Sequence, residues 1–214
     1  MKPLLAVPVL PLVLGAAALA GAQTRPLQTE EAATARAGTL VLEAGADVML
    51  DEPNFLTGGE RTRLDAPVLR LVWSPADTVE VDVEWTARVA ALDDPDFGTV
   101  SDWGDVALRA KMQLRDGSDG LGVAARFGVT LPQTSFGNGL GPNALRMSAQ
   151  LLVSLCEGAC VHANAGLAIH DEVDRPHEQR DFLHYGLAVV APAEGTLSVV
   201  AELAGLAGRG APGA

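Results

Sequence analysis

The feature that most constrains the fold is a two-residue alternation of apolar and charged side chains along residues 79–115. Small and large apolar residues occupy every second position, and charged residues occupy most of the positions between them. The charged members include Glu80, Asp82, Glu84, Arg88, Asp105, Arg109 and Lys111. A period of two predicts β-strands, because successive side chains of a strand point to opposite faces of the sheet. The sequence therefore predicts two strands, each with one apolar and one charged face.

An apolar face opposite a face with dense charges of both signs is typical of transmembrane β-barrels, whose outer surface contacts lipid and whose interior is polar. Antiparallel pairing across residues 90–104 would place Glu84 opposite Arg109 and Asp82 opposite Lys111. Opposite charges in such positions stabilise a strand pair. We therefore expect the charged faces to line a barrel interior.

The same two-faced pattern recurs along most of the chain and predicts about nine strands. Pro67 interrupts the second strand, so we expect a bulge or a register shift there. Arg126 and Arg146 add to the charged faces. The expected strands are residues 39–50, 63–74, 78–90, 104–116, 120–132, 144–155, 159–170, 181–192 and 195–206.

The connections alternate between long and short. Residues 51–62, 91–103, 133–143 and 171–180 form the long ones. This alternation is characteristic of antiparallel up-and-down barrels of the outer membrane, with long external loops and short periplasmic turns. Such barrels in bacteria carry an even number of strands, so we expect a C-terminally truncated barrel that lacks roughly one to three strands.

The first residues predict export. Lys2 precedes an apolar stretch at residues 4–19, and Ala20-Gly21-Ala22 is an A-x-A cleavage site, so residues 1–22 are expected to be a signal peptide. An uncleaved N-terminal anchor is the alternative. Residues 23–38 are expected to be a periplasmic segment, with a short plug or an unordered stretch as alternatives. Residues 39–214 then form the incomplete barrel domain.

Charge excludes some partners. The chain has 15 Lys+Arg and 27 Asp+Glu, a net charge of −12, which disfavours nucleic acid and simple adsorption to anionic lipid.

Cys156 and Cys160 are a candidate disulfide across a turn, and two free thiols are the alternative, since bridging requires a suitable Cα distance.

Several loop and turn segments are distinctive, namely residues 25–30, 51–55, 93–98, 102–106, 131–139 and 176–180. Together they resemble the Gram-negative outer-membrane family labelled as the MetA pathway of phenol degradation, also called a transporter family. The resemblance covers nearly all of the chain after the signal peptide. It implies a barrel of about a dozen strands and uptake of aromatic or other small hydrophobic compounds. It supplies no catalytic or binding residues, and the turn with Cys156 and Cys160 departs from the family pattern.

The charged strand faces are the best functional candidate, as a lining that selects solutes. The predicted lining residues are Glu80, Asp82, Glu84, Arg88, Asp105, Arg109, Lys111, Arg126 and Arg146. The sequence thus predicts a passive channel or uptake protein of the cell outer membrane, with membrane lipid and a small-molecule solute as partners. One alternative is a closed structural or surface-interaction barrel. Another is a soluble secreted ligand-binding barrel with its apolar faces turned inward, which the low aromatic content of 4% keeps open.

Catalysis, cofactors and metals are not expected. His162-Ala163-Asn164 is similar to the His-x-Ser stretch of outer-membrane phospholipases but lacks the nucleophile, and the chain contains no Gly-x-Ser-x-Gly elbow. The acidic loop at residues 93–96 lacks the spacing of a calcium-binding loop. The sequence therefore predicts that the protein is not an enzyme.

Overall fold

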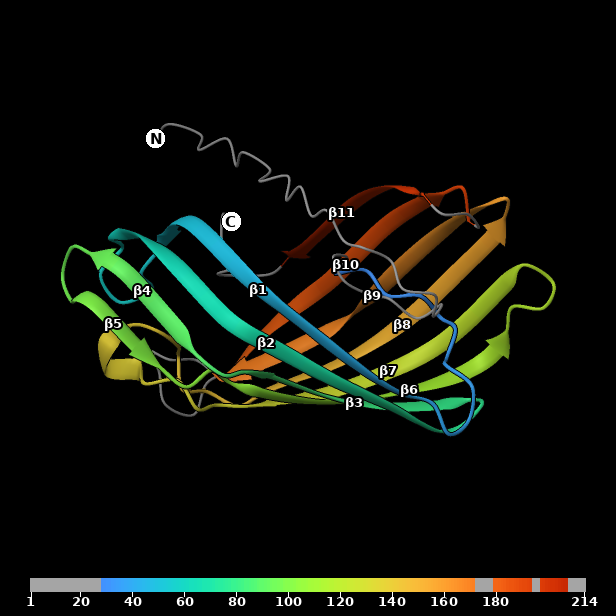
Figure 1. The fold of residues 1–214 in the computed structure, drawn as a ribbon, viewed down its shortest axis with the longest axis horizontal. Helices are drawn as coiled ribbons and strands as arrows, with labels where there is room; N and C mark the ends of the chain where they lie inside the picture. The colour runs from blue at the N-terminus through green and yellow to red at the C-terminus, as the bar shows by residue number, and fades with distance from the viewer. Residues whose placement is uncertain (1–27, 172–178, 194–196, 208–214) are drawn as a thin grey trace.

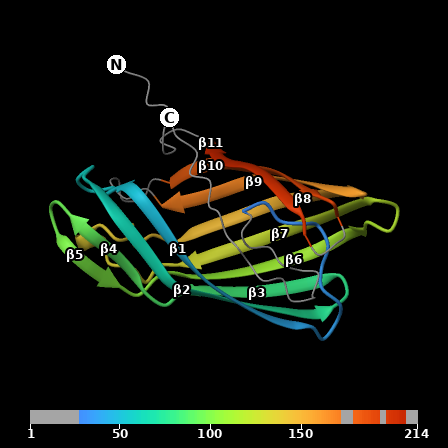
Figure 2. The same ribbon diagram turned by 45° about the horizontal axis from the view of Figure 1, so that its top comes forward.

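A computed structural model describes residues 28–171, 179–193 and 197–207. Its main element is one antiparallel sheet of 11 strands that curves around a hollow side, as Figures 1 and 2 show from two directions. The sheet is open, and it does not close into a barrel within these residues. The predicted signal peptide, and most of the predicted loop at 171–180, lie outside the described residues.

The strands follow one another along the chain. They are β1 (Leu40–Pro53), β2 (Glu60–Ala76), β3 (Val79–Thr86), β4 (Val89–Asp94), β5 (Gly98–Asp102), β6 (Val106–Asp116), β7 (Leu121–Leu131), β8 (Arg146–Glu157), β9 (Ala159–Asp171), β10 (Gln179–Ala191) and β11 (Val199–Ala207), with one short 3-10 turn at Phe136–Asn138. The sheet order is β11-β10-β9-β8-β7-β6-β3-β2-β4-β5, and β1 pairs with the other edge of β2.

Each of the nine expected strands has a counterpart, but the structure adds a hairpin of β4 and β5 where the sequence predicted the end of one strand and a long loop. The hairpin forms because β2 changes its pairing partner. It pairs with β3 from Val68 onward and with β4 over Thr62–Asp65. Pro67 lies between these two parts and has no N–H to donate. The expected register shift is present there, between β1 and β2.

The pairing of β3 with β6 also differs from the expectation. Asp82 lies opposite Arg109, and Glu80 lies opposite Lys111, so the register is displaced by two residues. The added hairpin contains most of the residues that the sequence analysis placed in the loop between these two strands. A displacement by two leaves every side chain on its predicted face, because the side-chain period of a strand is also two.

The two faces of the sheet have opposite character. Large apolar side chains lie exposed on one face, among them Leu42 at 70% and Leu151 at 50% exposure. Charged side chains lie buried on the other, including Arg70 at 3% and Asp82 at 4% exposure. Antiparallel sheets of water-soluble proteins bury their apolar face instead. In this sheet most of the large apolar residues face outward, and most of the charged residues face the hollow side.

β1 and β11 form two borders of the sheet. Nine strands, from β1 through β2, β3 and β6 to β11, are joined by antiparallel pairings, so these two border strands run in the same direction. Direct pairing of one border with the other would therefore be parallel.

Gly166 in β9 gives a test of the close strand packing. A Cβ atom here would lie 2.1 Å from the carbonyl oxygen of Ala149 and 2.6 Å from the Cα atom of Gln150. We expect Gly166→Ala to lower the free energy of unfolding by about 1–3 kcal/mol, measured by urea unfolding, because these backbone atoms must move apart. Gly137→Ala is the control, since a Cβ at Gly137 has nothing within 4 Å. Equal stability of the two variants would contradict this packing.

Candidate functional site: the charged hollow face

The N-terminal segment, residues 28–38, crosses the hollow face of the sheet. The backbone N–H of Gln28 donates to Glu202 of β11 over 3.1 Å, and that of Ala32 donates to Ser154 of β8 over 2.8 Å. Further along, the backbone N–H of Ala37 donates to Asp77, in the turn between β2 and β3, over 2.7 Å. One short segment touches strands far apart in the sheet only by spanning its concave side. Residues 28–38 therefore lie across the hollow face of the sheet.

Glu30 anchors the N-terminal segment through buried ion pairs. Its carboxylate lies 3.3 Å from Arg70 of β2 and 2.6 Å from Arg126 of β7. Asp82 of β3 joins the same two arginines, at 3.1 Å and 3.4 Å, and lies 2.9 Å from Arg109 of β6. These five residues form a continuous network, hereafter the central ion-pair network. Its members come from four strands and the N-terminal segment.

Asn164 of β9 holds the backbone of Glu30. With its amide oriented to match donors and acceptors, the Asn164 oxygen accepts from the Glu30 N–H at 2.6 Å and its nitrogen donates to the Glu30 carbonyl at 2.9 Å. Ala32 is fully buried against Ala124 and Leu152. The segment is thus fixed by charge, backbone and packing contacts together.

Most of the predicted lining residues meet in ion pairs on this face. Glu80 pairs with Lys111 at 3.1 Å, and Glu84 pairs with Arg109 at 2.9 Å. Asp105 pairs with Arg146 at 2.8 Å.

Arg88 lies apart from the other predicted lining residues. It is exposed, and its guanidinium group lies 5.0 Å from the ring centre of Trp103, which stacks on Trp85. Val89 and Ala91 are buried against Leu140, so the alternation changes phase between β3 and β4. A two-residue period continued from β3 predicted Arg88 on the charged face. Because the alternation changes phase after β3, Arg88 lies on the same face as Trp85 instead.

Several members of the charged face were missing from the predicted lining, among them Arg70, Glu43 and Glu30. Arg70 and Glu43 lie 3.6 Å apart and alternate with exposed leucines in β2 and β1, so the alternation that identified the other residues could also have found them. Glu30 has no such signal, because it precedes the first strand and its position depends on the N-terminal segment folding back.

A second group of contacts closes one end of the hollow face. Arg61 of β2 lies 3.1 Å from Asp94 and donates to the carbonyl oxygen of Gly139 at 2.6 Å. Asn54 donates to Asp94 at 2.9 Å. Gly139 has a φ of 70°, and a Cβ there would lie 2.4 Å from Asn54, so this position requires glycine. The residues between β7 and β8, 132–145, hereafter the cap loop, are therefore fastened to β2 and β4.

The Asp94 carboxylate is fully engaged within the protein. Burial alone would raise its pKa, but hydrogen bonds from Asn54, from the backbone N–H groups of Asp96 and Phe97, and from Arg61 lower the pKa to about 2. The acidic loop that contains Asp94 therefore uses this carboxylate to fix its own turn. Among the described residues, no group of three or more His, Cys, Asp or Glu side chains is placed to hold a metal ion.

A polar cavity of about 340 Å³ lies between the cap loop and the charged strands. Its charged lining consists of Arg63, Asp65, Glu84, Asp105, Arg109 and Arg146. Four of these six were predicted lining residues. The cap loop partly covers this cavity on the hollow face.

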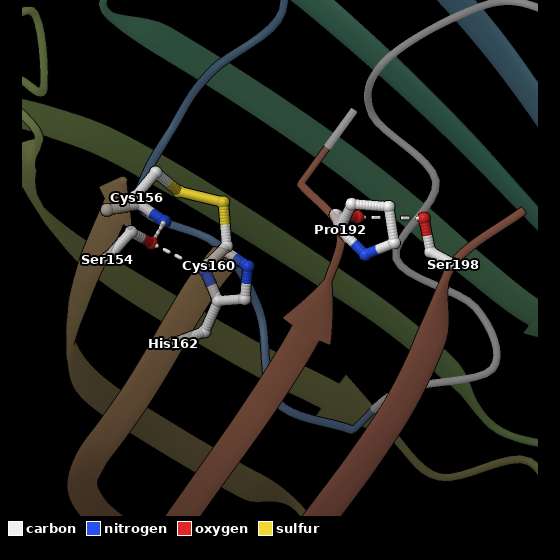
Figure 3. Close-up of a disulfide and its surroundings, with 7 residues drawn as sticks. Ser154, Cys156, Cys160, His162, Pro192 and Ser198 are labelled. Carbon is white, nitrogen blue, oxygen red and sulfur yellow. Dashed lines mark hydrogen bonds between the residues drawn. A yellow bond between two sulfur atoms is a disulfide. The ribbon is translucent and has the colours of Figure 1, made fainter. Parts of the chain in front are cut away.

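The two cysteines form a disulfide in the tight turn between β8 and β9, with Cα atoms 4.1 Å apart (Figure 3). Close by, the Ser154 hydroxyl forms a 2.8 Å hydrogen bond with Nδ1 of His162, as Figure 3 also shows. The two other histidines among the described residues have separate surroundings: His170 packs against Phe182, and His184 hydrogen-bonds Gln150.

Comparison with protein-family models, curated proteins and solved structures gave no match to this chain. In the described parts of the chain there is no helix of the length and apolarity needed to cross a membrane.

Replacing Asp94 tests the contacts that close the end of the hollow face. We expect Asp94→Asn to lower the free energy of unfolding by about 3 kcal/mol at pH 7, because Arg61 is left without its buried partner. The folded pKa is depressed below the unfolded value, so the stabilisation is present above about pH 4 and is lost as the pH falls toward 2. Urea unfolding at several pH values measures both effects. If the difference in unfolding free energy between the unaltered protein and Asp94→Asn stays constant down to pH 2, the low pKa of Asp94 is contradicted.

Replacing Glu30 tests the anchoring of the N-terminal segment. Glu30→Gln removes the charge that pairs with Arg70 and Arg126, so we expect amide hydrogen exchange in residues 29–35 to accelerate by about tenfold or more. Exchange in β7 and β8 should stay close to that of the unaltered protein. Glu157→Gln, in the exposed turn between β8 and β9, is the matched control. Unchanged exchange in the segment would mean that Glu30 does not hold it.

Proposed function

We propose that this chain is a lipid-embedded β-sheet of the bacterial outer membrane and forms the wall of a passive channel for small solutes. The observation that carries the proposal is the inverted distribution of side chains, with leucines exposed on the outer face and ion pairs buried on the hollow face. Exposed apolar area is unfavourable in water by about 25 cal/mol per Å². The same area is favourable against lipid chains, which explains why the outer face is apolar across the whole sheet.

The strand lengths fit a bilayer. β6 has 11 residues and β9 has 13 residues. At roughly 3.4 Å per residue and a tilt of about 45°, they span roughly 26–31 Å along the membrane normal, close to the thickness of a hydrocarbon core.

The two ends of the sheet differ, which supports the expected orientation. The cap loop and the β4–β5 hairpin form the bulkier end, and the disulfide turn between β8 and β9 belongs to the opposite end (Figure 1). Outer-membrane barrels place long connections outside and short turns in the periplasm. The proposal therefore places the cap loop outside and the disulfide turn in the periplasm.

The proposal requires partners for the two borders of the sheet. Lipid does not tolerate unpaired backbone N–H and C=O groups, so β1 and β11 must be paired with other strands within the membrane. A closed barrel of about a dozen strands meets this requirement. The proposal also includes uptake of aromatic compounds and a relationship to the phenol-degradation family. These two parts rest on the loop segments alone.

A closed structural barrel is the second candidate, and the central ion-pair network favours it. Glu30, Arg70 and Asp82 are buried, and the N-terminal segment occupies the hollow face. Swelling of liposomes in small isosmotic solutes separates the two candidates, because only an open lumen admits solute. Swelling that exceeds that of protein-free liposomes supports a channel, and its absence supports the closed barrel.

A charge on the outer face tests the contact with lipid. Leu151 lies half exposed near the middle of β8, and we expect Leu151→Arg to lower the stability of the protein in lipid vesicles by about 2–4 kcal/mol. Leu197→Arg is the control, because Leu197 lies outside the strands, in the connection from β10 to β11. The measurement is urea unfolding in vesicles, followed by the heat-dependent shift in gel mobility. If Leu151→Arg is harmless and improves solubility without detergent, the outer face contacts water.

A further inference from the structure

The cavity under the cap loop has an unusual charge arrangement. Three arginine–carboxylate pairs surround it: Arg63 with Asp65 at 2.8 Å, Arg109 with Glu84 at 2.9 Å, and Arg146 with Asp105 at 2.8 Å. The six charges sum to zero within the cavity wall. Its volume of about 340 Å³ suits a small organic molecule.

The cavity wall offers little to an aromatic or hydrocarbon solute. Its apolar members are Ala107, Leu140 and Pro142, and no aromatic side chain is among the lining residues. An aromatic ring would therefore find no aromatic stacking partner, and it would displace water from guanidinium and carboxylate groups without replacing the hydrogen bonds of that water. Removing water from charged groups is costly when no new hydrogen bond replaces it.

A solute with a single charge also fits poorly. An anion that binds one arginine competes with the carboxylate already paired to it, and leaves that carboxylate without its counter-charge. A cation at one of the carboxylates has the same effect on its arginine. A solute that carries both charges keeps the summed charge of the cavity at zero, because it brings a negative group to an arginine and a positive group to a carboxylate together.

Arg146 and Glu84 are the groups that best present opposite charges to such a solute. Arg146 is the most exposed of the three arginines, holds Asp105 through Nη2, and has a buried Nε–H without a hydrogen-bond partner in the described part of the chain. Glu84 lines the same cavity and its side chain is 26% exposed. A guanidinium group binds a carboxylate through paired N–H donors, and a carboxylate accepts hydrogen bonds from an ammonium group.

We propose that this cavity binds a small zwitterionic solute of the amino-acid class, with the solute carboxylate at Arg146 and its ammonium group at Glu84. The inference deepens the proposed channel function, on which it rests, by naming the class of solute that the lumen selects. It departs from the aromatic solutes implied by the sequence resemblance.

Calorimetric titration of the detergent-refolded protein at pH 7 tests the binding site directly. The probes are L-alanine, propionate, ethylamine and phenol, because propionate lacks the ammonium group of alanine and ethylamine lacks its carboxylate. We expect alanine to bind at least about tenfold more tightly than the three others, since each charged hydrogen bond that is lost weakens binding by about that factor. Equal binding of propionate, tighter binding of phenol, or no binding of alanine would overturn the proposal.

A double variant localises the site. Arg146→Gln with Asp105→Asn removes one pair without a net change in charge, and we expect the affinity for alanine to fall by about tenfold or more. The matched control is Arg115→Gln with Asp119→Asn, which removes an exposed pair in the turn between β6 and β7 and should leave the affinity unchanged. Arg146→Lys, which keeps the charge but loses the planar fork, is the second variant if the first does not fold, and it should also weaken binding. Unchanged affinity in a folded Arg146 variant would overturn the assignment.

Liposome swelling separates failure of this inference from failure of the proposed function. Alanine binding without any solute flux leaves the binding site in place and contradicts the channel. Flux of small solutes without any preference for alanine in titration or swelling supports the channel and overturns the zwitterion site.

Discussion

The structure depends on the central ion-pair network, because it brings like and unlike charges from four strands and the N-terminal segment into one buried group. Arg70, Arg109 and Arg126 each contact Asp82, and Glu30 contacts two of them. Buried charges are tolerated only when they are paired, so these strands are held at a curvature that keeps the side chains in contact. The hollow shape and the charge network therefore require each other.

The apolar outer face follows from the same constraint. A strand has only two faces, so a charged interior leaves leucine, valine and methionine on the outside, as at Leu114 and Met147. This arrangement is unstable in water and stable in lipid, and it connects the chemistry of the interior to the proposed location of the protein. The cap loop then turns part of the charged face into an enclosed cavity, with polar groups on nearly every side.

Local alternation predicted much of the fold. The nine expected strands, the faces of Asp82 and Lys111, and the irregularity at Pro67 all depend on neighbouring residues in the chain. Arg88 shows the limit of this reasoning, since a two-residue period cannot reveal a change of phase between β3 and β4. The β4–β5 hairpin was missed for a similar reason: its strands are short, and their pairing with β2 depends on where β3 ends.

By itself the sequence determined the two-faced strands, because the alternation of side chains is a local property that every register preserves. Only the tertiary structure decided which residues lie directly opposite one another, since a displacement of two residues between β3 and β6 changes the opposite residue at every position but no face. The expected pair of Glu84 with Arg109 still forms, although these residues are not directly opposite. It also decided the position of Glu30 and the enclosure of the cavity by the cap loop. Both depend on contacts between residues far apart in the chain, whose free energy is gained only after the sheet has curved.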